Sequence, residues 1–177
     1  MSRTPATPFY SAETLRPETS LGYLIKRIGS VMGQIAETTF EQEPISFTQW
    51  IVLATLQGQV PMSATALSDH VGHDMGALTR VVDSLEKAGY VKRERGVEDR
   101  RTVEISLTPA GRRQMESSKR QVVGLLNLLV QPFSHAEVEA LIEQMQRLLV
   151  RLLDHVGSPS DPKLPASVLA SARRKPQ

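Results

Sequence analysis

Cysteine is absent from this sequence of 177 residues. The chain therefore forms no disulfide and has no thiol nucleophile, cysteine metal cluster or thiol-based redox sensor. Aromatic residues are scarce at 5%, and no apolar run reaches the ~18 residues that a membrane-spanning helix needs. The N-terminus lacks the basic and then apolar layout of a secretion signal. We therefore expect a cytoplasmic protein with no membrane partner.

Sequence signatures of an enzyme are missing as well. There is no glycine-rich phosphate loop and no nucleophile elbow, and scattered Ser, His and Asp residues do not make a catalytic triad without geometry. His70, His73 and Asp74 are close enough in sequence to suggest a metal site. However, two histidines on either side of a helix break are more often exposed or capping residues. We therefore predict no catalytic residue, no metal and no cofactor.

The net charge of +2 does not by itself indicate a nucleic-acid partner, so the position of the charges is more informative. Residues 87–101 hold six basic residues (87, 92, 93, 95, 100 and 101) and three acidic ones (94, 98 and 99). The chain length suits one domain, or one domain with an appended helical part. The position of this basic cluster in the fold is therefore the charge feature that bears on a nucleic-acid partner.

Residues 62–89 are predicted to form two short helices that meet in a tight corner. Ser63 and Asp74 are the capping residues expected at the two helix starts. Gly72 and Gly89 follow the last apolar position of each helix, where a glycine in the left-handed conformation commonly ends a helix. The second helix turns leucines and valines toward the core and leaves small and polar side chains outside.

A β-hairpin is predicted directly after this second helix. Residues 90–95 and 102–107 are strand-like runs, and the charged residues between them form the turn. In the second run Val103, Ile105 and Leu107 alternate with polar residues and are expected to point inward. Two helices in a tight corner followed by a hairpin form a winged helix-turn-helix. The predicted fold class is therefore mainly α with a small β-wing.

Long apolar helices are predicted on both sides of this unit. Apolar residues recur at helical spacing over residues 20–45, and Pro132 divides the apolar stretch after residue 108 into two helices expected to pair as an antiparallel hairpin. A helix that is apolar around most of its girth has to be buried around most of it. One small winged domain cannot cover three such helices, so we predict a two-fold homodimer in which the terminal helices interleave.

The predicted organisation has five segments. The two outermost are assigned on their proline, serine and basic residues, and the inner three on helix and strand patterns. The segments are a mobile N-terminal arm (1–19), an N-terminal dimerisation helix (20–45), the winged helix-turn-helix domain (46–108), two C-terminal dimerisation helices (109–156) and a flexible basic tail (157–177).

The outward side of the second helix and the basic hairpin are the predicted DNA contacts. Short side chains in the first helical turn allow close approach to a DNA backbone, and Thr79 and Arg80 can reach base edges or phosphates. The alternative for each residue is an ordinary solvated surface. The alternative for the whole unit is a protein-binding winged-helix module, which would have an apolar outward face. The predicted set is Ser63, Asp74, Met75, Gly76, Ala77, Thr79, Arg80, Asp83, Arg95, Asp99, Arg100 and Arg101.

Three runs of residues carry a family resemblance: TRVVDSLEKAGYVKR over 79–93, DRR over 99–101, and LTPAG over 107–111. With one helix before the winged unit and two after it, they resemble the MarR/SlyA family of bacterial transcription regulators over roughly residues 20–156. The resemblance implies a homodimer on a palindromic operator, more often a repressor than an activator. It implies a recognition helix (74–88) in the major groove.

The same resemblance assigns roles to the hairpin, with Arg100 and Arg101 in the minor groove and Asp99 holding the arginines in place. Asp74 departs from the pattern, because many members have serine or threonine there. An aspartate repels nearby phosphates, although it is a good helix cap. The cysteine of the peroxide-sensing branch is missing, which excludes thiol sensing.

A small-molecule effector is also implied by the resemblance. In the family, the effector lies where the dimerisation helices meet the winged domain, and it is often an aromatic acid. Tyr23, Arg27 and Trp50 are the candidate lining residues, with Arg27 positioned to pair with a carboxylate. The alternative is that Trp50, the only tryptophan, belongs to the core and that Arg27 is a surface charge.

Overall fold

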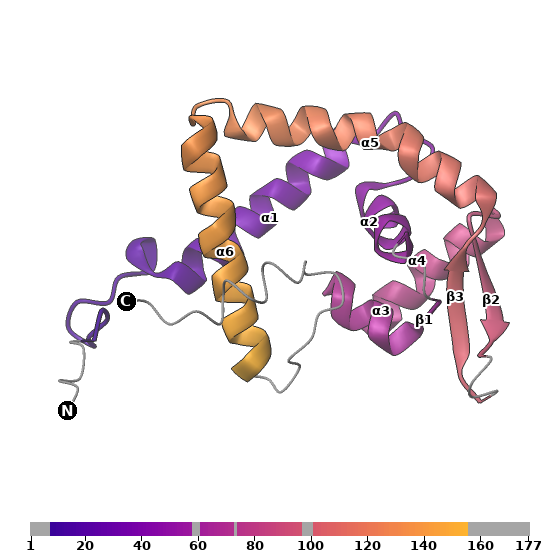
Figure 1. Ribbon diagram of the computed structural model, residues 1–177, viewed down its shortest axis with the longest axis horizontal. Coiled ribbons are helices and arrows are strands. Elements are labelled where there is room, and N and C mark those ends of the chain that lie inside the picture. Colours follow the sequence, from indigo (N-terminus) through magenta and orange to yellow (C-terminus); the bar gives the residue numbers. More distant parts are fainter. Residues whose placement is uncertain (1–7, 58–60, 73, 97–100, 156–177) are drawn as a thin grey trace.

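A computed structural model describes residues 8–57, 61–72, 74–96 and 101–155 (Figure 1). The chain is mostly helical, with one small antiparallel sheet. In chain order the elements are the 3-10 helix η1 (Pro17–Thr19), α1 (Leu21–Thr39), α2 (Phe47–Leu56), β1 (Met62–Ser63), α3 (Ala64–Val71), α4 (Met75–Lys87), β2 (Val91–Arg95), β3 (Val103–Leu107), α5 (Pro109–Val130) and α6 (His135–His155). The predicted winged helix-turn-helix with flanking helices is confirmed.

The helix ends follow the local signals in the sequence. Ser46 and Gln49 form a reciprocal capping box at the start of α2. Gly72 ends α3 with a positive φ of 72°, and Gly89 follows α4 with a φ of 74°. Both glycines occupy the left-handed region that side chains with a Cβ rarely adopt. These two turns fix the corner between α3 and α4 and the passage from α4 into the hairpin.

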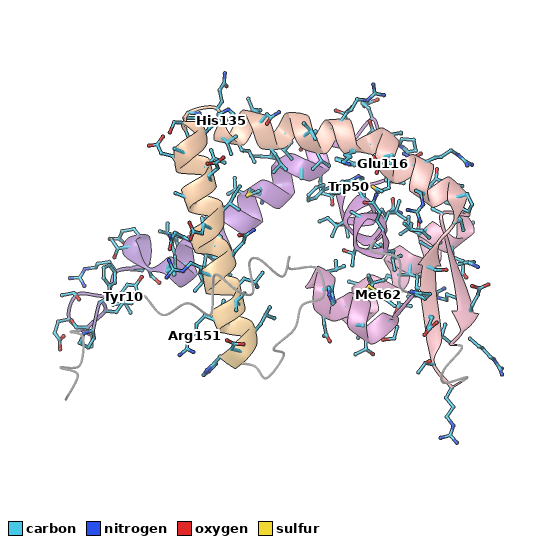
Figure 2. The ribbon with its side chains drawn as sticks, in the orientation of Figure 1. Tyr10, Trp50, Met62, Glu116, His135 and Arg151 are labelled. Carbon is cyan, nitrogen blue, oxygen red and sulfur yellow. The ribbon has the colours of Figure 1, made fainter. Side chains whose placement is uncertain are left out.

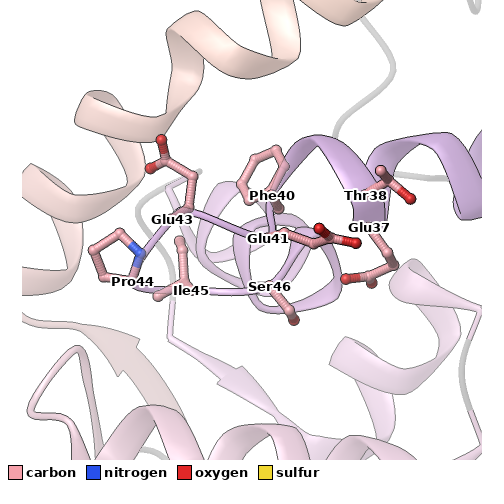
Figure 3. A pocket seen from close by; sticks show the side chains of 8 residues that line it. All are labelled: Glu37, Thr38, Phe40, Glu41, Glu43, Pro44, Ile45 and Ser46. Atoms are coloured by element: carbon pink, nitrogen blue, oxygen red, sulfur yellow. The ribbon is translucent and has the colours of Figure 1, made fainter.

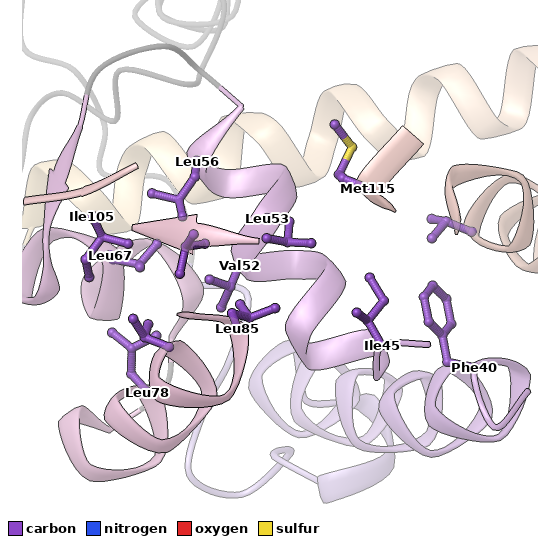
Figure 4. Close-up of a cluster of buried hydrophobic side chains, with 13 residues drawn as sticks. Phe40, Ile45, Val52, Leu53, Leu56, Leu67, Leu78, Leu85, Ile105 and Met115 are labelled. Atoms are coloured by element: carbon purple, nitrogen blue, oxygen red, sulfur yellow. The ribbon is translucent and has the colours of Figure 1, made fainter. Parts of the chain in front are cut away.

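The core of the winged unit is closed within one chain. Leu67 of α3 and Leu78 and Leu85 of α4 are almost fully buried against Leu53 of α2. Figure 4 shows these side chains converging with Ile105 of β3 between the helices and the sheet. Because three helices and a strand each contribute a fully buried residue, the orientation of α4 is set by the packing on its inner side.

The sheet has the order β1–β3–β2, with both pairs antiparallel. Ile105 pairs with Met62 on one side and with Arg93 on the other, and it is buried as predicted. The prediction for Val103 was wrong, because its side chain is 50% exposed. Val103 pairs with Arg95 at the outer end of the hairpin. Alternation along a strand predicts a shared face, but burial requires that the core extends far enough to cover it.

The start of α5 is fixed to the base of the hairpin. The Thr108 hydroxyl donates to the carbonyl of Gly89 at 2.7 Å, and its backbone N–H donates to the carbonyl of Tyr90 at 3.1 Å. A Cβ on Gly111 would overlap the carbonyl oxygen of Tyr90, so this close approach needs glycine. The run over 107–111 is therefore the junction that sets the direction of α5 relative to the hairpin.

The two C-terminal helices do not form the antiparallel hairpin that the sequence suggested. Figure 1 shows α6 turning away from α5 at a corner near His135, which Figure 2 labels, and running across rather than back along it. Most of the apolar side chains on α6 are exposed, and Val150 is its one buried residue. The expectation failed because a short connection does not make two helices pair when each has apolar surface for another partner.

Two carboxylates at the end of α1 and in the turn after it connect this region to α2 and α5. Glu37 of α1 accepts hydrogen bonds from the backbone N–H groups of Phe47 and Thr48 at the start of α2, at 3.3 and 3.2 Å. Glu43 accepts from the buried hydroxyl of Ser118 on α5 at 2.7 Å. These bonds satisfy donors that helix starts and buried positions otherwise leave unpaired.

No helix of the described residues is both long enough and apolar enough to cross a membrane.

Candidate nucleic-acid interface

The outward face of α4 holds five of the twelve predicted contact residues. Leu78, Val82 and Leu85 face the core, which leaves Met75, Gly76, Thr79, Arg80 and Asp83 on the exposed side. Ala77 lies between the two and is half-buried. Seen along the helix, the exposed residues fall within one continuous sector, because positions three and four apart share a face. The structure thus brings these predicted residues together on one surface.

Asp74 occupies the cap of this helix and is exposed. Its carboxylate accepts a hydrogen bond from the backbone N–H of Ala77 at 3.0 Å. This bond, with smaller contributions from the N–H of Gly76 and the charge of Arg80, lowers the pKa of Asp74 below its ordinary value. The carboxylate is turned back onto its own helix, where its charge is favourable. The aspartate that stands where many MarR/SlyA members have serine or threonine therefore acts as the cap of α4.

Asp83 is held by an arginine of the hairpin. The guanidinium of Arg93, on β2, contacts the carboxylates of Asp83 at 2.6 Å and Glu86 at 2.5 Å. Partial burial disfavours the charge of Arg93, but hydrogen bonds and charge attraction from the two carboxylates outweigh it and raise its pKa. Sequence reasoning assigned Asp83 to DNA and overlooked this bridge. The spacing of Asp83 and Glu86, three apart on one helix face, was the available signal.

Backbone pairing in the hairpin continues one step past the ends of β2 and β3. Arg95 ends β2 and is exposed, and Arg101 is exposed just before β3. The backbone N–H of Gly96 donates to the carbonyl of Thr102 at 2.9 Å, which continues the pairing outward. Asp99 and Arg100 lie outside the described residues, so their predicted roles in the wing have no structural description here.

Ser63 has a structural role at the start of α3. Its hydroxyl accepts a hydrogen bond from the N–H of Ala66 at 3.2 Å, while its backbone belongs to β1. The residue thus joins the sheet to the first helix of the helix-turn-helix. Its side chain is half-buried, in contrast to the exposed residues of α4.

The three predicted effector residues are not brought together within one chain. The indole N–H of Trp50 donates to the carbonyl of Met115 on α5 at 3.0 Å, and Figure 2 shows Trp50 beneath that helix. Trp50 stacks on Phe47, which contacts Phe40 at the end of α1. Tyr23 lies 16 residues before Thr39, or ~24 Å along the helix axis. Tyr23 and Arg27 are exposed in the first half of α1, away from Trp50.

Two surface hollows lie elsewhere. The hollow in Figure 3, at the turn between α1 and α2, is lined by Glu37, Thr38, Phe40, Glu41, Glu43, Pro44, Ile45 and Ser46. Its three carboxylates would repel an acid. The second hollow lies at the corner between α5 and α6 and is lined by Asn127, Val130, Gln131, Phe133, His135, Val138 and Glu139. Neither includes Tyr23, Arg27 or Trp50.

The histidine of α3 has a partner within its own helix. The Nδ1 atom of His70 lies 2.8 Å from the carbonyl oxygen of Ala66. His73 lies outside the described residues. Within the ranges that the structure describes, no three His, Asp or Glu side chains are grouped as metal ligands require.

Comparison with known proteins gives one consistent result. The model of the MarR family matches residues 45–103, which include α2, the helix-turn-helix and β2 and end at the first residue of β3. The HTH-type transcriptional regulator SarZ of Staphylococcus haemolyticus is 32% identical over 71 residues, which are 40% of this chain. The match spans 48% of SarZ, about half its length.

Solved structures extend the likeness to the flanking helices. The crystal structure of wild-type apo MarR from E. coli has a TM-score of 0.66 and 26% identity, covering 73% of this chain and 97% of that one. A structure of Bordetella bronchiseptica BpsR, described for regulation of its DNA binding by 6-hydroxynicotinic acid, has a TM-score of 0.66 at 20% identity. It covers 76% of this chain and 96% of BpsR, and at this identity it shows the fold alone. Residues 45–103 thus match the MarR family model, and the chain has the fold of the winged-helix regulators of that family.

Proposed function

We propose that two copies of this chain bind a palindromic operator and act as a transcriptional repressor. The observation that carries the proposal is the exposed face of α4, with Thr79 and Arg80 outward beside a hairpin that carries Arg95 and Arg101. A helix of this kind fits the major groove, and basic side chains on the hairpin fit the adjacent minor groove. The bridge from Arg93 to Asp83 and Glu86 supports this arrangement, because it holds hairpin and helix in one orientation.

Homodimer formation is supported by the terminal helices. Leu24, Ile28 and Met32 on α1 and Ile142 and Leu149 on α6 are exposed apolar residues at helical spacing. Apolar surface of this extent on a protein is typical of an interface between subunits. A second copy would bring the same surface, and a two-fold axis would place the two α4 helices about one helical turn of DNA apart.

Selection of bound sequences from a random duplex pool, followed by mobility-shift titration, tests this proposal. We expect enrichment of an inverted repeat, and affinity that falls steeply with salt because cations on the DNA are released. Arg80→Ala and Arg101→Ala should each weaken binding by ~1–3 kcal/mol. Arg147→Ala on α6 is the matched control and should leave binding unchanged. Failure to enrich any sequence, together with salt-independent binding, would contradict the proposal.

A protein-binding winged-helix module is the alternative function. Such a module needs an apolar outward face on α4, whereas Arg80 and the bridged carboxylates of Asp83 and Glu86 make the exposed face largely charged. A duplex with scrambled half-sites separates the two possibilities. A sequence-specific regulator binds the scrambled duplex much more weakly than the selected one, whereas a protein-binding module does not distinguish them.

Release by a small aromatic acid is the final part of the proposal. The family resemblance and the ligand-regulated DNA binding described for BpsR support it. Because Tyr23 and Arg27 of one chain lie far along α1 from Trp50, the site would combine α1 of one protomer with α2 and α5 of its partner. The single tryptophan gives a direct measurement, since a bound acid should change its fluorescence and lower operator affinity. Arg27→Gln should weaken both effects, and an unchanged operator affinity across a panel of aromatic acids would contradict ligand release.

A further inference from the structure

Within the largely charged exposed face of α4, the first two turns carry one guanidinium, that of Arg80, among small or apolar side chains. Met75 is 44% exposed at the first helical position, Gly76 has no side chain, and Ala77 presents a half-buried methyl group. A Cβ on Gly76 would lie 3.2 Å from the Asp74 carboxylate, so a side chain at this position would contact the cap. Arg80 is the only side chain among positions 75–80 of this helix that carries several hydrogen-bond donors.

Thr79 belongs to this apolar surface despite its hydroxyl. The hydroxyl donates to the carbonyl oxygen of Met75, one turn back on the same helix, at 2.7 Å. A threonine hydroxyl has one proton, and this bond uses it. The side chain is exposed, so its Cγ2 methyl group and the acceptor lone pairs of its hydroxyl oxygen remain to contact a neighbour. The Asp74 carboxylate is likewise turned onto the backbone of its own helix.

Major-groove chemistry relates this surface to particular bases. Thymine presents a C5-methyl group there, which apolar side chains contact, and guanine presents two acceptors that arginine bonds in a bidentate manner. Met75 and Thr79 are four residues apart on one face, ~6 Å along the axis, and successive bases on a strand are ~3.4 Å apart. The two side chains therefore span about two base-pair steps.

We infer that Met75 and Thr79 determine specificity by reading the methyl groups of thymines one or two steps apart, next to a guanine read by Arg80. This inference rests on the proposed function, because it requires α4 to enter the major groove. The inference goes beyond the proposed function by naming the bases and the chemical group that are recognised. The face would select a thymine-containing half-site through van der Waals contact and a guanine through hydrogen bonds.

Deoxyuridine provides the direct test, because it differs from thymidine only in lacking the methyl group. Using the full-length protein and its selected operator, each half-site thymine is replaced in turn and the dissociation constant is measured by fluorescence anisotropy. Replacement at one or two positions should weaken binding about fourfold each, the effect expected for losing one buried methyl-sized group. Equal affinity for thymidine and deoxyuridine at every position would overturn the inference.

Paired substitutions at one position separate the methyl from the hydroxyl of Thr79. Thr79→Val keeps a methyl group and should retain the ratio of affinities for thymidine and deoxyuridine duplexes. Thr79→Ser keeps the hydroxyl and should bring the ratio at one thymine close to one, while Met75→Ala should do so at the other. Thr38→Ser, at an exposed threonine of α1, is the matched control and should leave both ratios unchanged.

The outcomes distinguish this inference from the function on which it rests. Binding that is tight and sequence-specific but insensitive to deoxyuridine leaves the regulator intact and overturns methyl reading. The reverse pattern, in which Thr79→Val loses the ratio and Thr79→Ser keeps it, assigns readout to the hydroxyl and also overturns the inference. Absence of binding to any duplex overturns both proposals. Circular dichroism of each variant shows whether α4 is still folded.

Discussion

The winged unit buries most of its leucine side chains, whereas the terminal helix α6 leaves most of its leucine side chains exposed. In the winged unit Leu53, Leu67 and Leu85 are fully buried, although the helices that carry them are only 8 to 13 residues long. On α6, which has 21 residues, Leu141 is 54% exposed and Leu152 is 52% exposed. Helix length therefore does not decide burial here. The number of elements that surround each helix does.

This difference indicates which part of the protein is complete within one chain. Three helices and a sheet enclose one core in the winged unit, and its buried side-chain N and O atoms among the described residues all have partners. α1 and α6 expose apolar rows that a second chain would cover. Stability of the winged unit should therefore be a property of the single chain, whereas the order of α6 should depend on protein concentration.

Replacement of a core leucine should produce the largest loss of stability. Leu85→Ala removes a fully buried side chain and should destabilise the winged unit by ~2–5 kcal/mol, because it leaves a cavity that the neighbours only partly fill. Urea unfolding measures this loss. Leu128→Ala is the matched control on α5, where the side chain is 64% exposed. Its effect should be much smaller and should vary with protein concentration, and equal, concentration-independent losses would contradict the comparison.

Charges on the exposed face of α6 should separate the two protomers. Ile142→Glu combined with Leu149→Glu places two carboxylates seven residues apart on one helix face, where burial in an interface would be costly. Sedimentation velocity should show a monomer, and operator affinity should fall by about 100-fold because the two half-sites are no longer bound together.

The control for this substitution is Glu143→Gln, an exposed polar position on the same helix. It should leave the dimer and the operator affinity unchanged. The thermal transition of the winged unit should persist in the double variant, since its core does not include these residues. A double variant that remains dimeric would show that α6 is covered by something other than a second copy.

Features decided over a few residues could be predicted from the sequence. The caps at Ser63 and Asp74 and the glycine turns at Gly72 and Gly89 depend on local backbone chemistry, and all four were predicted correctly. The exposed face of α4 also followed from periodicity. These signals lie within one or two helical turns of the residues they describe, so no tertiary information was needed.

Features decided by distant packing could not be predicted in this way. The turn of α6 away from α5 and the exposure of Val103 depend on how far other elements extend. The bridge between Arg93 and Asp83 joins residues ten apart on different elements. The hydrogen bond from the Thr79 hydroxyl to the Met75 carbonyl depends on the side-chain rotamer, which the sequence does not determine.

Removal of the bridge between helix and hairpin should have a moderate effect. Arg93→Gln breaks two ion pairs of a side chain that is 28% exposed, and should destabilise the winged unit by about 1 kcal/mol, the upper part of the range for partly exposed pairs. Lys92→Gln is the matched control on the neighbouring position, since the pair between Lys92 and Glu94 is more exposed. Unfolding in urea at low salt compares the two, and a loss for Lys92→Gln as large as that for Arg93→Gln would show that the bridge has no special role.

The smallest effect should be the pH dependence of two carboxylates at helix starts, Asp74 at the cap of α4 and Glu137 in the first turn of α6. In the winged unit the pKa of Asp74 is lowered, mainly by the backbone N–H of Ala77. On α6 the pKa of Glu137 is lowered, mainly by the backbone N–H of Ser134 and then by its hydroxyl. A group whose pKa is lower in the folded state stabilises the fold above its unfolded pKa, and this contribution is lost as pH falls through the folded pKa. Both caps should therefore weaken as the pH falls below about 5 and through their lowered pKa values.

Amide hydrogen exchange at the first turn of each helix, followed across this range, measures the two caps separately. Asp74→Asn keeps an acceptor at the cap without a titrating charge, so exchange protection at Ala77 should lose most of its dependence on pH. Glu137→Gln should do the same at the start of α6. Because α6 would be ordered by a partner chain, its protection should also rise with protein concentration, whereas that of α4 should not. Concentration-dependent protection at Ala77 would contradict the comparison, because it would show that the winged unit also depends on a second chain.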